Sequence, residues 1–90
     1  MIIEFTKSFD RQFSSLAPDP QVKNKPIIDR FISSYASKQF PNGLRVYKCG
    51  PFVSLSVSMN HRIFVFPIPD GIQFVFAGDH EAAGQYLKQN

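Results

Sequence analysis

Cysteine is nearly missing from this 90-residue sequence, in which Cys49 is the only thiol. One cysteine can form neither an internal disulfide nor a cysteine-rich zinc site, and nothing near it in sequence supplies a base that would make it a nucleophile. Long apolar runs are missing too, since no stretch approaches the roughly 18 consecutive apolar residues of a membrane span. Residues 1–5 also lack the basic start of a signal peptide. These absences predict a cytoplasmic protein with no membrane partner.

Acidic residues are absent from residues 31–69, although the whole sequence contains seven of them. The same stretch holds four basic residues, Lys38, Arg45, Lys48 and Arg62, so its charge is +4 within a net charge of +3. A locally basic surface attracts a polyanion, and it equally attracts an acidic protein segment. The charge distribution leaves both kinds of partner open.

Helical patterns follow a short β-prone start at residues 2–5. Thr6 or Ser8 can cap a first helix. Its apolar face would consist of Phe9, Phe13 and Leu16. Prolines in residues 17–20 predict a turn, because proline lacks a backbone donor and disfavours helical geometry in the residue before it.

A second helix is predicted from Asn24, which can cap it, with Pro26 in the first turn. Its apolar residues recur at helical spacing: Ile27, Ile28, Phe31, Ile32 and Tyr35. The two helices would form a hairpin that ends at the turn-forming residues 40–43, which include Asn42-Gly43.

The second half of the sequence alternates between β-prone runs and turn residues. Strands are predicted at residues 44–49, 52–59, 62–66 and 72–77. Asp79 can cap a short terminal helix that runs through Leu87. The sequence therefore predicts one α+β domain over residues 1–90, in which an N-terminal strand and a two-helix hairpin pack on an antiparallel sheet, in the order β-α-α-β-β-β-β-α.

Three segments in this order resemble the RelE/ParE superfamily of bacterial toxins. Residues 2–13 look like the usual start of that family, where a short strand enters a helix through Lys-Ser-Phe or a similar sequence. His61-Arg62 followed by apolar residues resembles a family strand that begins with Tyr-Arg or His-Arg. Residues 70–81 resemble the closing hairpin and its histidine-containing end. The resemblance covers nearly the whole chain.

The resemblance implies a toxin of a type II toxin–antitoxin system, which would bind a cognate antitoxin. RelE-like and YafQ-like members cut mRNA, often on the ribosome, whereas ParE-like members act on DNA gyrase. We therefore expect a metal-independent endoribonuclease without a cofactor that acts on mRNA, with the ribosome as a further partner. A ParE-like toxin that cuts nothing, or an inactive relative that only binds protein, remains the alternative.

Candidate catalytic residues follow from the chemistry of RNA cleavage, which needs proton transfer and stabilisation of a crowded phosphorane. Arg62 matches the phosphate-stabilising arginine of the resembling ribonucleases, and a guanidinium suits phosphate oxygens. His80 matches the histidine of the YafQ-like terminal motif, and imidazole can both accept and donate a proton. Asp79 would orient His80. Tyr86 would take the place of a C-terminal tyrosine found in some relatives, or else pack in the core.

Candidate RNA-binding residues lie on the neighbouring strands: Arg45, Tyr47, Lys48 and His61. Arg45 and Lys48 would bind phosphate and Tyr47 would stack on a base, or each would be ordinary strand surface. His61 adjoins Arg62, but neighbours on a strand point to opposite faces. No metal site is expected from the two histidines, since no further ligand has a recognisable spacing.

The sequence departs from the strongly basic RelE-like pattern in one strand. Residues 72–78 hold no basic residue, and the first strand after the helices has no glutamate that could act as a base. A histidine-dependent arrangement is the remaining option for catalysis.

Overall fold

The computed structural model describes residues 1–15, 18–37, 39, 45–57 and 60–89, and for residues 18–24 it describes the backbone alone. Five strands and three helices lie in these ranges. They are β1 (Ile2–Phe5), α1 (Lys7–Ser14), α2 (Pro18–Ser37), β2 (Arg45–Cys49), β3 (Phe52–Ser56), β4 (His61–Ile68), β5 (Gly71–Asp79) and α3 (His80–Gln89). The element order is the predicted one, and the α+β class is confirmed.

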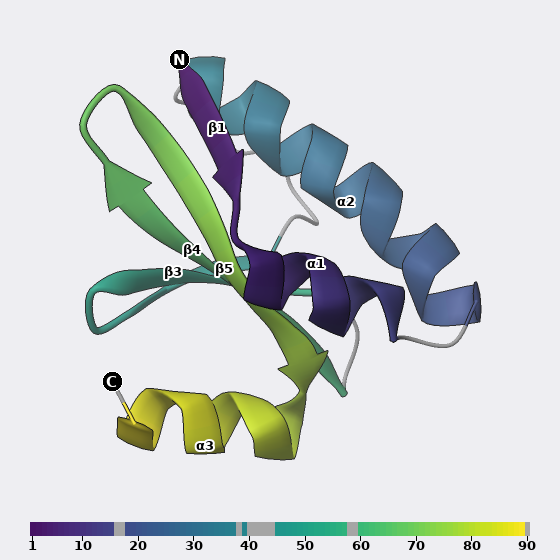
Figure 1. The fold of residues 1–90 in the computed structure, drawn as a ribbon. Helices are drawn as coiled ribbons and strands as arrows, with labels where there is room; N and C mark the ends of the chain where they lie inside the picture. Colours follow the sequence, from purple (N-terminus) through teal and green to yellow (C-terminus); the bar gives the residue numbers. More distant parts are fainter. Residues whose placement is uncertain (16–17, 38, 40–44, 58–59, 90) are drawn as a thin grey trace.

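The five strands form one sheet in the order β1-β5-β4-β3-β2. β2 to β5 are the predicted antiparallel meander. β1 pairs in parallel with β5, from Ile2 opposite Gly71 to Phe5 opposite Phe74. Figure 1 shows β1 alongside β5, while the chain between them runs through both N-terminal helices and the meander. The sequence pattern did not predict this parallel edge.

Helices cover both faces of the sheet (Figure 1). Because successive strand residues point to opposite faces, the largely apolar strands supply two separate cores. Phe9 of α1 and Phe31 of α2 pack on one face, with the buried residues Ile28, Leu55, Ile63, Val65, Ile72, Phe74 and Ala77. α3 packs on the other face through Ala83, against Phe52, Phe64 and Phe76.

α1 begins at the predicted cap. The Thr6 hydroxyl accepts a hydrogen bond from the Phe9 N–H at 3.0 Å, which satisfies one of the free donors at the helix start. Gln12 then ties the helix to the sheet, since its side-chain oxygen accepts a hydrogen bond from the Ala77 N–H at 2.9 Å.

α2 is longer than predicted, and the proposed cap at Asn24 is wrong. The helix begins at Pro18, so residues 18–20 form its first turn and Pro26 lies inside it. Prolines in a first turn cost little, because the first N–H groups of a helix have no intrahelical partner. Pro26 removes one internal hydrogen bond. Although α2 has 20 residues, no helix in the described part of the chain is long and apolar enough to cross a membrane.

The strands differ from their predicted bounds at their ends. β4 and β5 extend beyond the predicted residues 62–66 and 72–77, and β3 ends at Ser56, before the predicted end at Met59. Leu16, Leu44 and Met59, which the predictions also included, lie outside the described residues. A bulge after Phe64 shifts the register, so that Phe64 pairs with Phe76 but Val65 pairs with Phe74. The bulge leaves Val75 as the extra residue on β5.

Candidate functional site

Polar side chains gather on the face of the sheet that α3 covers. Ser54 lies opposite Phe64, and Ser56 lies opposite Arg62, across the β3–β4 pair. Residues directly opposite one another in an antiparallel pair share a face. Two serines, an arginine and a phenylalanine thus lie together because of the register, although they belong to different strands.

α3 begins at the edge of this surface. The Asp79 carboxylate accepts a hydrogen bond from the Ala82 N–H at 2.7 Å, so the predicted cap is confirmed. The helix therefore starts at His80, and His80, Ala83, Gly84 and Leu87 follow at the spacing of one helical face. Capping by Asp79 fixes where this face begins.

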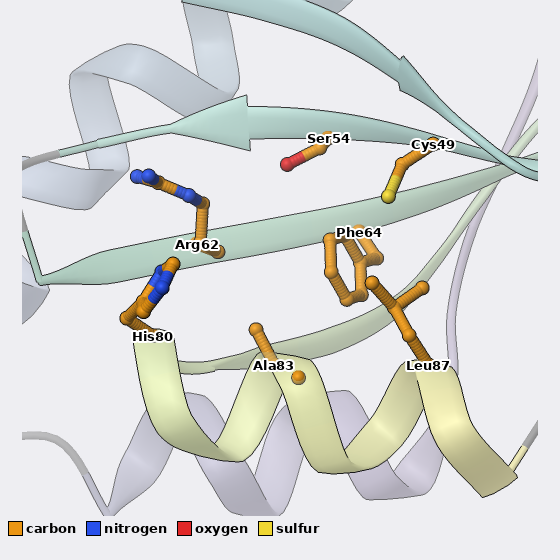
Figure 2. Close-up of a pocket in the computed structure, with 8 residues that line it drawn as sticks. Cys49, Ser54, Arg62, Phe64, His80, Ala83 and Leu87 are labelled. Carbon is orange, nitrogen blue, oxygen red and sulfur yellow. The ribbon is translucent and has the colours of Figure 1, made fainter.

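A pocket of about 200 Å³ lies between α3 and the sheet (Figure 2). Its lining residues come from β2, β3, β4 and α3: Cys49, Ser54, Arg62, Phe64, His80, Ala83, Gly84 and Leu87. Figure 2 shows Arg62 and His80 together at one end and Phe64 with Leu87 at the other. The pocket therefore has a polar, basic end and an apolar end.

Arg62 is held in place by the strand beside it. Its Nη1 donates a hydrogen bond to the Ser56 hydroxyl at 2.6 Å and lies 3.5 Å from the His61 carbonyl oxygen, which it also contacts. The side chain is half-buried, while His80 is exposed. Acidic side chains are missing from the lining residues. A phosphate at this end would thus meet a positioned guanidinium and an imidazole without a competing carboxylate in the lining.

The first comparison with known proteins is by sequence, and it finds no relative. No family model matches this chain, and no curated protein does.

The solved structures do match. A chain of the RelB–RelE antitoxin–toxin complex from Methanococcus jannaschii superposes with a TM-score of 0.70 at 17% identity, over 92% of this chain and 96% of that chain. The chain has the RelE-like toxin fold. A metal-bound toxin from Helicobacter pylori gives a TM-score of 0.69 at 16% identity, over 91% and 97% of the two chains. A chain of the E. coli DinJ–YafQ complex gives 0.65 at 11% identity, over 90% and 94%.

Within the RelE-like fold, the predicted RNA-binding residues divide between two faces. Arg45 pairs with Ser56 and Tyr47 with Ser54, so both share the pocket face, and both are exposed. Lys48 pairs with Val53, whose side chain packs against the α1/α2 core, and therefore lies on the opposite face. His61 precedes Arg62 in β4 and points away from the pocket face.

The other two predicted catalytic residues, Asp79 and Tyr86, do not line the pocket. Asp79 uses one carboxylate oxygen to cap α3. The Tyr86 ring packs among Phe52, Phe64 and Phe76 with ring centroids 4.9 to 5.9 Å apart, and Tyr86 is not a lining residue. This is the core position that the sequence left open for Tyr86.

Potential metal-ligating residues do not cluster in the part of the chain that the structure describes. Among the described residues, no group of three or more His, Cys, Asp or Glu side chains is placed to hold a metal ion. His61 and His80, the pair considered from sequence, are separated because His61 points away from the pocket face that His80 lines.

Sequence reasoning predicted two of the eight lining residues, Arg62 and His80, and missed the other six, among them Cys49, Ser54 and Gly84. Cys49 was interpreted as a small strand residue, Ser54 as part of a hydroxylated face, and Gly84 was not singled out. Ser54 and Ser56 lie on the same face of β3 because strand residues alternate, and Ser56 lies opposite Arg62. A prediction of the β3–β4 register would therefore have placed Ser54 on the face of Arg62. An isolated glycine inside a predicted helix was the available signal for Gly84.

Proposed function

We propose that this chain is the toxin of a type II toxin–antitoxin system and that it cleaves mRNA, on the ribosome, without a metal ion. The observation that carries the proposal is the pairing of Arg62 and His80 in one pocket. The RelE-like fold supports it, since the neighbours of this fold include toxins in complex with antitoxins.

The proposed reaction is attack of a ribose 2′-oxygen on the adjacent phosphorus. The 2′-oxygen loses its proton, a pentacoordinate phosphorane forms, and the bond to the 5′-oxygen breaks as that oxygen gains a proton. The products are a 2′,3′-cyclic phosphate and a 5′-hydroxyl. Arg62 would stabilise the charge of the phosphorane, and His80 would transfer the protons.

The supporting residues have defined parts in this proposal. Ser56 holds the Arg62 guanidinium by a hydrogen bond, and Asp79 positions His80 by capping α3. Arg45 and Tyr47 lie on the same face and are exposed, so they would bind the RNA on either side of the cut. Lys48 and His61 would contact RNA, if at all, on the opposite face.

The proposed antitoxin partner is supported by an exposed apolar edge. β1 lies at the end of the sheet, and Ile2, Ile3 and Phe5 are 51%, 37% and 44% exposed. An extended chain can pair with such an edge through its backbone and cover these side chains. An acidic segment of the antitoxin would neutralise the positive charge of residues 31–69, which hold no acidic residue.

Induced expression with primer extension on total mRNA tests the proposal. Wild type should arrest growth and create new mRNA 5′ ends, and the Arg62→Ala/His80→Ala double variant should do neither. Arg11→Ala/Gln85→Ala is the matched control, since both residues are exposed and neither lines the pocket. Arrest with intact mRNA and gyrase-linked DNA breaks would replace this proposal by a ParE-like one.

A further inference from the structure

The apolar end of the pocket is not used by the proposed chemistry. Arg62 and His80 account for one end, while Phe64, Leu87 and the Cys49 side chain line the rest. A phosphate does not need apolar walls. The shape therefore suits a ligand that carries a negative charge at one end and a flat apolar group at the other.

Ser54 provides a polar group within these walls. It is 6% exposed and lines the pocket. Figure 2 shows its hydroxyl oxygen directed into the space between Arg62 and Phe64. A hydroxyl at the wall of a pocket is placed to bond a polar group that enters the pocket. A hydroxyl can donate or accept.

Gly84 leaves room on the opposite wall. It lies inside α3, where glycine is a poor helix former, and a Cβ added there would have nothing within 4 Å. Neither backbone strain nor close packing requires glycine at this position, because its φ is not positive and its surroundings are open. Any side chain here would extend into the space next to the pocket.

We propose that this pocket holds one nucleobase of the RNA whose phosphate lies between Arg62 and His80. The base would lie against Phe64 and Leu87, with Ser54 bonded to its polar edge and Gly84 leaving space for its ring. A volume of about 200 Å³ is below the range of pockets for drug-sized ligands and fits one base, not two. This inference rests on the proposed function and makes Ser54 and Gly84 specificity-determining residues.

Binding of nucleoside 3′-monophosphates to the purified chain tests the pocket without any cleavage. The four nucleotides and ribose 5-phosphate are titrated and followed by amide NMR shifts. The best nucleotide should bind about tenfold more tightly than ribose 5-phosphate, and it should shift the Ser54 and Gly84 amides. Nucleotides that bind no better than ribose 5-phosphate would overturn the proposal.

Gly84→Leu fills the pocket and should remove that tenfold preference. Gln85→Leu is the matched control, because it adds the same side chain at the next, exposed residue of α3, outside the pocket lining. Ser54→Ala and Gly84→Ala are the milder variants if Gly84→Leu fails to fold, which circular dichroism would reveal. Ser54→Ala should change the order of preference among the four bases. Wild-type nucleotide binding by both Gly84→Leu and Ser54→Ala would contradict the inference.

Two results distinguish an error in the base pocket from an error in the proposed cleavage. If the chain cuts RNA but the Ser54 and Gly84 variants cut the same sites at the same rates, the pocket inference alone is wrong. If the chain binds nucleotides as described and cuts no RNA in cells, the proposed cleavage is wrong and the base pocket is supported.

Discussion

Arg62 owes its position to one neighbour in the sheet. Ser56 lies opposite it in the register, and the 2.6 Å hydrogen bond from Nη1 directs the guanidinium along the pocket face. A strand-end arginine without such a partner would sample many rotamers. The proposed role in stabilising charge depends on this fixed geometry as well as on the charge itself.

Replacement of Arg62 should separate charge from geometry. We expect Arg62→Ala to lower the rate of RNA cleavage about 100- to 1000-fold, as for loss of one positioned donor to a transition state. Arg62→Lys keeps the charge but loses the planar fork, so most of the loss should remain. The measurement is the single-turnover rate for each folded variant. Full activity in Arg62→Ala would remove this residue from the site.

Gly84 allows a stability prediction at the same scale. Gly84→Ala should raise the free energy of unfolding by about 0.5–1 kcal/mol, because alanine is the better helix former and its Cβ meets nothing within 4 Å. Thermal unfolding should therefore show a higher Tm. A lower Tm would mean that Gly84 has a packing role that the open surroundings do not indicate.

Sequence patterns singled out the two proposed catalytic residues but not the pocket around them. Arg62 and His80 stand out because of their chemistry and their place in the resembling motifs. Cys49, Ser54 and Gly84 do not, because their importance depends on which residues lie opposite one another and on where α3 crosses the sheet. Strand register and the position of α3 on the sheet are set by tertiary packing, which the sequence pattern does not contain.

At the scale of elements, two junctions organise the molecule, and the docking of β1 on β5 is the first. β1 docks in parallel on β5 with Ile2 opposite Gly71. A Cβ on Gly71 would collide with the Ile2 backbone, 2.9 Å from its Cα and still closer to its carbonyl group. Glycine is therefore required at this crossing of the two strands.

Gly71→Ala should lower the free energy of unfolding by about 1–3 kcal/mol, because the added methyl group must displace β1. Gly84→Ala is its matched control, being the same substitution at an open position and having the opposite expected sign. Chemical denaturation of the two variants measures both effects. Equal stability of Gly71→Ala and wild type would show that β1 does not need this close approach.

The second junction is the start of α3, where Asp79 caps the helix that carries His80. Asp79→Ala should lower the stability by about 0.5–2 kcal/mol through loss of the hydrogen bond to the Ala82 N–H. Asp79→Asn can keep a capping oxygen without the charge, so stability and cleavage should both stay close to wild type. If Asp79→Asn folds normally but loses cleavage, the carboxylate acts on His80 by its charge and not only by capping.

Element prediction was most accurate where the pattern was strongly periodic. The meander and the cap of α3 followed from alternation and from Asp79, whereas the start of α2 was placed at Asn24 because prolines near 18–20 suggested a turn. The helix tolerates them in its first turn, where their missing donors have no partner to lose.

At the scale of the whole molecule, the two faces of the sheet carry separate cores, and the pocket lies on one face only. The face under α1 and α2 is apolar and closed, with Phe31, Leu55 and Phe74 fully buried. The face under α3 is only partly covered and holds the pocket. Composition and element order were sufficient to predict the α+β class, but the parallel placement of β1 was not, because the β-prone pattern at residues 2–5 does not specify which strand it joins.

We propose that the whole chain acts as an RNA-cleaving toxin whose chemistry uses the 2′-hydroxyl. The most direct measurement maps the ends of cleaved mRNA in cells that express the wild-type chain and in cells that express Arg62→Ala/His80→Ala. In the wild type we expect new 5′ ends that can be ligated only after a kinase adds a phosphate, each paired with an upstream 2′,3′-cyclic phosphate. The double variant should lack these ends. New ends that already carry a 5′-phosphate, or growth arrest with intact mRNA, would contradict the proposal.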